Sequence, residues 1–126
     1  MRAELLKDVL KSQQGELDAV VMYNELAKVV PASDRETFKR LAAEEGHHAA
    51  VFFNYSNEKL EPNDRNAKLL VKLYKLIGKK ALYPLIAKGE YAAAKNYEHL
   101  IADLPEVRAV KEDETRHGDT VKALLK

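Results

Sequence analysis

The sequence contains no cysteine and no tryptophan. Without cysteine the chain can form no disulfide, no iron–sulfur cluster, no rubredoxin-type or zinc-ribbon site and no thiol nucleophile. Any metal that it binds must therefore be held by histidine, aspartate and glutamate. The composition fits a cytoplasmic location, and we expect no cysteine-ligated domain in the protein.

The sequence also lacks long apolar runs and an excess of charge of one sign. No stretch approaches the ~18 uninterrupted apolar residues of a membrane span, and the first residues lack the apolar run of a signal peptide, so we expect neither. The 21 Lys and Arg nearly balance the 20 Asp and Glu, and the formal charge of +1 gives no reason to expect nucleic-acid binding. With 126 residues, 46% of them apolar, the chain fits one compact domain.

Apolar residues recur at helical spacing through almost the whole chain, and no segment alternates as a strand does. Proline and glycine mark the ends of the helices: Pro31 ends the first, Gly78 ends the third, and Pro105 suits the first turn of the last. Ser33 followed by Glu36 has the spacing of a capping box, which predicts the start of the second helix. We predict an all-α chain with helices over about 2–30, 34–55, 64–77, 80–102 and 105–125.

Four long helices and one short helix predict a four-helix bundle that forms a single domain over residues 1–126. Two helix hairpins, about 2–57 and 80–126, are joined by a crossover over 58–79 that contains the short helix. About 14 helical residues cover roughly 21 Å at 1.5 Å per residue, which is about one bundle length. The crossover is therefore long enough to return the chain to the far end of the bundle.

The two predicted hairpins repeat one another in sequence. Gly15-Glu16-Leu17-Asp18-Ala19 aligns with Gly89-Glu90-Tyr91-Ala92-Ala93 at an offset of 74 residues, and Tyr23 aligns with Tyr97. Further along, Glu45-Gly46-His47-His48 aligns with Glu114-Thr115-Arg116-His117. Each half thus contains a glutamate, a tyrosine seven residues later, and a Glu-x-x-His motif on the following helix.

Residues three apart lie on one face of a helix, so each Glu-x-x-His motif can direct a carboxylate and an imidazole into the same space. One such motif is common by chance in a charged helical chain, where it forms a solvated surface pair. Two motifs in register with two further glutamates match the di-metal carboxylate site of helix bundles. The six candidate ligands are Glu16, Glu45, His48, Glu90, Glu114 and His117.

Charge balance supports this interpretation. Four carboxylates buried together would cost several kcal/mol each in desolvation unless cations compensated them. Two divalent ions would balance the four negative charges. Oxygen-rich ligation with one nitrogen per metal suits iron or manganese, and six protein ligands leave coordination positions for oxygen or peroxide.

At these residues the sequence resembles the ferritin-like superfamily and, within it, the rubrerythrin-like di-iron proteins, from about Glu4 to Leu125. The resemblance implies a ferritin-like bundle in which the six candidate ligands hold two iron ions, or manganese in their place, with Glu45 and Glu114 as the bridging pair. It also implies that Tyr23 and Tyr97 lie beside the site and can hydrogen-bond a ligand carboxylate of the other hairpin. These two tyrosines are our candidate catalytic residues, and ordinary core packing is the alternative role for them.

The resemblance implies that the protein oxidises Fe(II) with oxygen or peroxide as its small-molecule substrate, as a peroxide scavenger in oxidative stress or as a ferroxidase. Because the chain has no cysteine, the electron donor must be a separate protein or a small reductant, and we expect a homodimer. Rubrerythrins carry an additional glutamate three residues after the first glutamate of the third bundle helix, and here that position is Ala93. A non-catalytic iron-binding or iron-delivery module, and a helical interaction protein with a vestigial motif, remain as alternatives.

Several polar residues near the motifs have other expected roles. His47 lies about 100° around the helix from His48 and should face away from the ligands. Glu44 and Asp113 precede the candidate ligands, and each either supports the site or is solvated. His99 is expected at the surface.

The segment 65–88 contains seven lysine and arginine residues and no acidic residue. One interpretation is an outer crossover helix that packs its apolar face on the bundle and solvates its lysines. The other is a surface that docks to an acidic partner or to a membrane surface.

Overall fold

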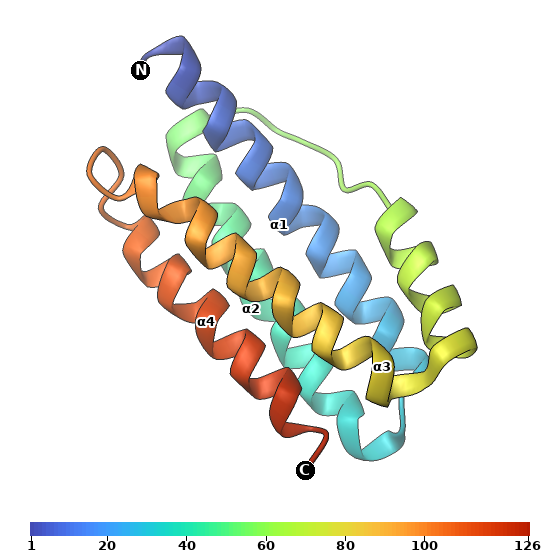
Figure 1. Ribbon diagram of the computed structural model, residues 1–126. Coiled ribbons are helices and arrows are strands. Elements are labelled where there is room, and N and C mark those ends of the chain that lie inside the picture. The colour runs from blue at the N-terminus through green and yellow to red at the C-terminus, as the bar shows by residue number, and fades with distance from the viewer. The chain divides into compact units, whose positions relative to one another are not determined.

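The computed structural model describes residues 1–126, and all of its regular structure is helical. The elements are α1 (Ala3–Val29), α2 (Ala32–Ser56), α3 (Arg65–Tyr97), the short 3₁₀ helix η1 (Glu98–Leu100) and α4 (Val107–Ala123), shown in Figure 1. The prediction of an all-α chain is confirmed. None of the helices is long and apolar enough to cross a membrane.

The chain forms two compact units, residues 1–72 and residues 73–126. The second unit begins at residue 73, and the internal repeat has an offset of 74 residues, so the unit boundary nearly coincides with the start of the second repeat. Each unit therefore contains one copy of the repeated pattern.

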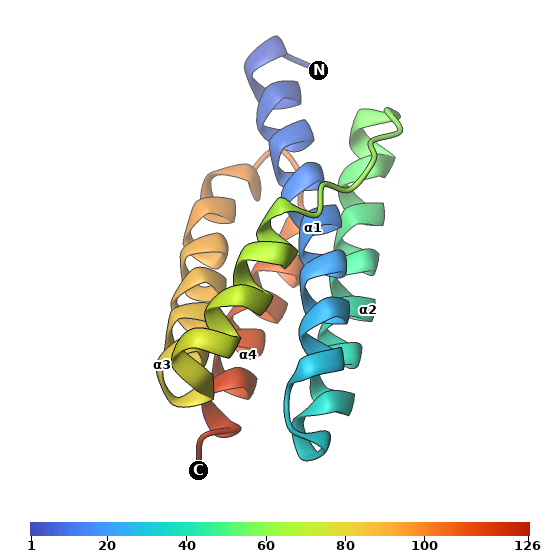
Figure 2. The same ribbon diagram turned by 90° about the vertical axis from the view of Figure 1, so that its right-hand side faces the viewer.

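In the first unit, α1 and α2 lie side by side and run in opposite directions (Figures 1 and 2). Their buried side chains lie along one face of each helix, mostly three or four residues apart, and the rings of Tyr23 and Phe38 stack with centroids 5.8 Å apart. Leu26, Leu41 and Phe52 are almost completely buried as well. Each such side chain contributes about 1.5–3 kcal/mol of hydrophobic stabilisation when it is removed from water.

The predicted capping box at the start of α2 is wrong. The helix begins at Ala32, its N-cap is Pro31, and no side chain caps it. Proline fixes φ near −65°, and Pro31 has the extended conformation of an N-cap residue, with φ −55° and ψ 146°. The helix therefore starts before Ser33. Asp34 lies in the first turn, where a carboxylate suits the positive end of the helix dipole.

Residues 57–64 form a segment without regular secondary structure, and side chains of α1 hold it in place. Gln13 donates a hydrogen bond to the Glu58 carbonyl at 2.8 Å, and Gln14 donates one to the Glu61 carbonyl at 2.8 Å. The Asn63 amide donates to the Asp18 carboxylate at 2.6 Å. These bonds satisfy backbone groups that no secondary structure pairs in this segment.

The second unit contains a sharp kink in α3 at Gly78, where φ is 76° and ψ is 175°. Gly78 interrupts the helix, and a second helical stretch follows it to Tyr97 (Figure 1). This combination of angles is almost restricted to glycine, which has no Cβ. The predicted break near Gly78 is therefore confirmed.

The connection between α3 and α4 differs from the prediction in detail. The helix expected to reach residue 102 ends at Tyr97, and η1 follows it. Lys111 on α4 forms an ion pair with Glu98 of η1. Helix α4 begins at Val107, two residues after Pro105, and runs antiparallel to the second stretch of α3 (Figure 1).

Candidate metal centre

The first cluster of candidate ligands consists of Glu16 on α1 and of Glu45 and His48 on α2. His48 Nδ1 lies 3.0 Å from Glu45 Oε1 and 3.5 Å from Glu16 Oε2. One ligand atom from each of the three residues lies within 4.8 Å of the others. The exposed fractions are only 2% for Glu16, 2% for Glu45 and 3% for His48, so this cluster is buried inside the protein.

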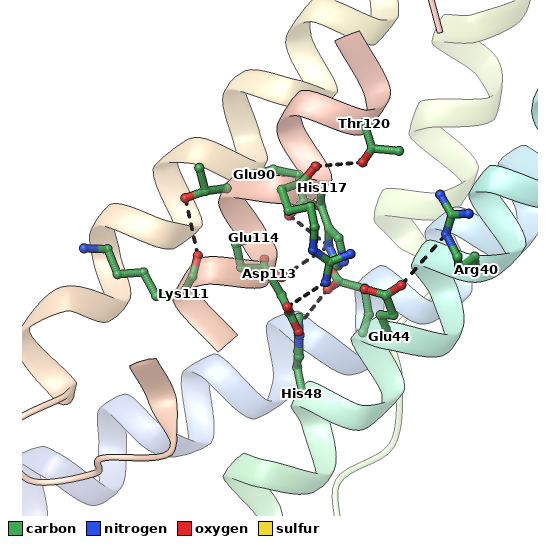
Figure 3. A network of polar contacts seen from close by, with 12 residues as sticks. Arg40, Glu44, His48, Glu90, Lys111, Asp113, Glu114, His117 and Thr120 are labelled. Atoms are coloured by element: carbon green, nitrogen blue, oxygen red, sulfur yellow. Dashed lines mark hydrogen bonds and ion pairs between the residues drawn. The ribbon is translucent and has the colours of Figure 1, made fainter. Parts of the chain in front are cut away.

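The second cluster consists of Glu90 on α3 and of Glu114 and His117 on α4 (Figure 3). His117 Nδ1 lies 3.5 Å from Glu114 Oε1 and 3.7 Å from Glu90 Oε2. Ligand atoms of these three residues also lie within 4.8 Å of one another. His117 is completely buried and Glu90 is 6% exposed. The two units thus contain matching clusters of two carboxylates and one imidazole.

Helical periodicity explains how these polar residues become buried. On α2 the candidate ligands Glu45 and His48 continue the stripe that begins with Phe38 and Leu41 and ends with Phe52. Helix α4 repeats this pattern, because its buried positions follow one another at intervals of three or four residues, apart from Gly118, which comes directly after His117. These positions are Val107, Val110, Glu114, His117, Gly118 and Val121. The ligands are therefore buried because they lie on the same helix face as apolar residues that pack in the interior.

The buried charge of each cluster calls for a cation. A buried carboxylate without a compensating charge is strongly disfavoured, and each cluster has two carboxylates and only one imidazole. Two oxygen ligands and one nitrogen ligand, with no sulfur, form a donor set that suits iron or manganese. The residues present therefore fit a metal site of the carboxylate and histidine type.

The polar residues next to the candidate ligands form pairs of their own. Glu44 Oε2 lies 3.9 Å from Arg40 Nε on the preceding turn of α2. Asp113 Oδ1 lies 2.6 Å from Arg116 Nη2, and both residues are on α4. Arg40, Glu44 and Asp113 are labelled in Figure 3. The expected outward orientation of His47 is confirmed, because it is exposed whereas His48 is buried.

The burial of the remaining candidate residues shows which of them lie at the surface and which lie inside the protein. His99 is exposed, as expected. Tyr23 is 1% exposed and Tyr97 is 7% exposed, so both candidate tyrosines are inside the protein. Tyr23 stacks on Phe38, which shows that it contributes to the core. A role of the two tyrosines in catalysis stays a prediction.

The sequence analysis did not identify the contact between Tyr91 and Gly118. A Cβ atom at Gly118 would lie 2.5 Å from Tyr91 Cε1, so the ring occupies the space that a side chain at 118 would need. The Tyr91 hydroxyl donates a hydrogen bond to Asp119, and this bond holds the pKa of Tyr91 above its usual value of 10.0. In the first half of the repeat, Leu17 and Ala49 stand in place of Tyr91 and Gly118. The exchange of a large and a small residue was visible in the aligned repeat and could have suggested the contact.

Comparison with known proteins agrees with this architecture. The family model described as rubrerythrin matches residues 8–125 and so includes all six candidate ligands. No curated protein and no solved structure gave a significant match. The match covers nearly the whole of an all-α chain with four helices. The chain therefore belongs to the rubrerythrin family of the ferritin-like superfamily, and its fold is the ferritin-like helical bundle of that family.

Proposed function

We propose that the protein binds two iron ions and oxidises Fe(II) with peroxide or oxygen. The observation that carries this proposal is the occurrence of the same buried cluster, two glutamates and a histidine, in both units. The ligands proposed for the two ions are the six residues of the first and second clusters: Glu16, Glu45, His48, Glu90, Glu114 and His117. Manganese has similar ligand preferences and can replace iron in such a site.

The charges of the clusters support a pair of divalent ions. The four glutamates carry four negative charges when they are ionised, and two divalent ions supply four positive charges, while the two imidazoles bind as neutral ligands. Six protein ligands for two ions, Glu45 and Glu114 among them, would leave coordination positions open to the substrate. A pair of iron ions, when bound, supplies the electrons that reduce peroxide or oxygen.

The side chains of the protein then have two tasks. The carboxylates and imidazoles hold the iron in a dry interior, where electrostatic interactions are stronger than in water. The buried hydroxyl groups of Tyr23 and Tyr97 are proposed to donate hydrogen bonds to ligand carboxylates, which would fix the orientation of those carboxylates. A separate electron donor is proposed to return the site to its reduced state, since the chain has no cysteine with which to hold a second, cysteine-ligated redox centre.

A non-catalytic iron-binding or iron-delivery module is the second candidate function. Ala93 favours it, because this position carries no carboxylate that could change its coordination when the iron is oxidised. The burial of all six candidate ligands argues against a third interpretation, a vestigial motif, since four buried glutamates without metal would destabilise the fold.

Anaerobic stopped-flow spectroscopy separates the two candidate functions. The protein is loaded with Fe(II) and mixed with peroxide or with oxygen, and the near-ultraviolet absorption of ferric iron bound to carboxylates is recorded. We expect this absorption to develop within seconds to minutes, with repeated turnover only when a reductant is supplied. A protein that binds two Fe(II) ions and reacts with neither oxidant would be a binding module. A protein that takes up no divalent metal would contradict both candidate functions.

A further inference from the structure

The crossover contains an uninterrupted helical stretch, residues 65–77, whose leucines are not all covered. Leu69 is 53% exposed and Leu76 is 72% exposed, whereas Ala67 is 1% exposed. Leu70 and Val71 are half-buried and lie toward the same side as Ala67. One apolar face of this stretch is thus covered by the protein, and a second, smaller apolar strip faces solvent.

Helix geometry places the two exposed leucines in line. Seven residues at about 100° each bring Leu76 to within about 20° of Leu69, two turns further along the helix. Lys72 lies about 60° around the helix from Leu69, and Lys68 and Lys75 lie about 100° from Leu69 and Leu76 respectively, on the same side as Lys72. The two leucines are therefore flanked on one side by basic side chains, and we call the line formed by Leu69, Lys72 and Leu76 the Leu69–Leu76 strip.

The positive charge around this strip is mostly uncompensated. The segment 65–88 carries seven cationic side chains and no acidic one. Lys68 forms an ion pair with Asp64 at 3.3 Å, and Lys79 lies over the ring of Tyr83 at 5.3 Å from its centroid. Lys72 and Lys75 form no ion pair in the structure. An occupant of the strip must therefore provide negative charge as well as an apolar surface.

We propose that the Leu69–Leu76 strip binds the surface of a membrane that contains anionic lipids. A helix that lies in the plane of the interface inserts its apolar side chains among the acyl chains, and its lysines extend to the phosphate groups. The leucines of the strip and the lysines that flank it have both features, and they occur on adjoining faces of one helix. A second copy of the chain fits the strip less well, because a symmetric contact would bring the same lysines together. This proposal does not depend on the metal site.

Vesicle cosedimentation tests the proposal with the metal-loaded full chain. We expect binding to vesicles of phosphatidylcholine with phosphatidylglycerol, much weaker binding to phosphatidylcholine alone, and weaker binding as salt is added. Leu76→Gln should lower the affinity about 10-fold through the loss of inserted apolar surface. Lys72→Gln combined with Lys75→Gln should lower it about 20-fold, because a lysine near an anionic surface contributes on the order of 1 kcal/mol.

Matched variants control for general effects of charge and hydrophobicity. Lys11→Gln combined with Lys59→Gln removes the same charge from exposed positions outside the segment, and Leu125→Gln removes an exposed leucine elsewhere. Both controls should bind nearly as the unchanged protein does. All the substituted side chains are exposed, so thermal melts should be unaltered.

Four results would overturn the proposal. The first is unchanged vesicle binding by the Leu76 variant, and the second is an equal loss of binding in the lysine control. The third is binding of soluble polyglutamate but of no vesicle, which would assign the strip to an acidic protein partner. The fourth is dissociation of a dimer by Leu76→Gln with no change in vesicle binding, which would assign the strip to a second copy of the chain.

Discussion

At the scale of single residues, adjacent histidines on α2 have opposite environments. His48 is 3% exposed and lies against two carboxylates, whereas His47 faces solvent. We expect His48→Ala to weaken iron binding by at least ~10-fold, the scale of loss when a ligand or its supporting group is removed. His47→Ala is the control and should have little effect. Competition against a coloured chelator measures both affinities, and a reversed order of the two effects would move the proposed ligand to His47.

A second prediction concerns the missing carboxylate at Ala93. We expect Ala93→Glu to raise the rate of peroxide turnover, because an added carboxylate three residues after Glu90 lies on the same helix face and can bind iron as its charge increases. Ala92→Glu, at the exposed neighbouring position, adds the same charge away from that face and should not raise the rate. Steady-state peroxide consumption with a supplied reductant compares the variants. Equal rates for the two variants would exclude a specific role of position 93.

The six candidate ligands could be found from the sequence because the motif occurs twice in register. The periodicity of a helix and the spacing of the repeat also separated His48 from His47 without a structure. The contact of Tyr91 with Gly118 was not predicted, because its distance depends on how two helices pack, although the large and small residues of the aligned repeat could have suggested it. The hydrogen bonds of Gln13 and Gln14 to the backbone of residues 58 and 61 were missed because they too depend on packing.

At the scale of the elements, most helix ends fall within two residues of the predictions. The ends that differ are those at which a backbone conformation decides the outcome. Pro31 has the N-cap conformation itself, so α2 starts before the serine that was expected to cap it. The helix that ends at Tyr97 continues as a 3₁₀ turn, and no proline or glycine in the sequence marks that change.

The hairpin of α3 and α4 depends on a small residue at position 118. We expect Gly118→Ala to destabilise the protein by about 1–3 kcal/mol, because the added methyl group displaces the Tyr91 ring and weakens its hydrogen bond to Asp119. Combining Gly118→Ala with Tyr91→Leu reproduces the residue pair of the first half of the repeat. This combination should recover part of the loss. Thermal or urea unfolding of the four proteins forms a double-mutant cycle, and strictly additive effects would refute the steric explanation.

The ion pair between Glu98 and Lys111 joins η1 to α4 and has a specific pH dependence. The ammonium group of Lys111 holds the pKa of Glu98 below its usual value of 4.5. A lowered pKa in the folded state means that the pair stabilises the protein above the unfolded pKa and that this contribution is lost as the pH falls through the folded pKa. Carbon NMR titration should give a Glu98 pKa below 4.5 that rises toward that value in Lys111→Gln. An unchanged pKa in the variant would show that another group lowers it.

At the scale of the whole molecule, the buried charge links metal content to stability. Metal that binds only the folded chain adds to the free energy of unfolding by mass action, about 2.7 kcal/mol when its free concentration is 100 times the dissociation constant. We expect removal of iron by a chelator to lower the melting temperature and its return to restore it. The combined variant His48→Ala with His117→Ala should lose most of this response. Calorimetry that gave the same melting temperature with and without the chelator would contradict the proposed metal site.

The conformation of Gly78 also restricts which sequences can encode this protein. No atom lies within 4 Å of the place where a Cβ would stand, so space alone would permit any residue there. The backbone nevertheless has a φ of 76° with a ψ of 175°, which costs every other residue type on the order of 1–3 kcal/mol. Random mutagenesis followed by selection for folding should therefore retain glycine at this partly exposed position as strictly as it retains a core residue. Selection for folding alone should let the lysines around position 78 vary far more freely than the glycine itself.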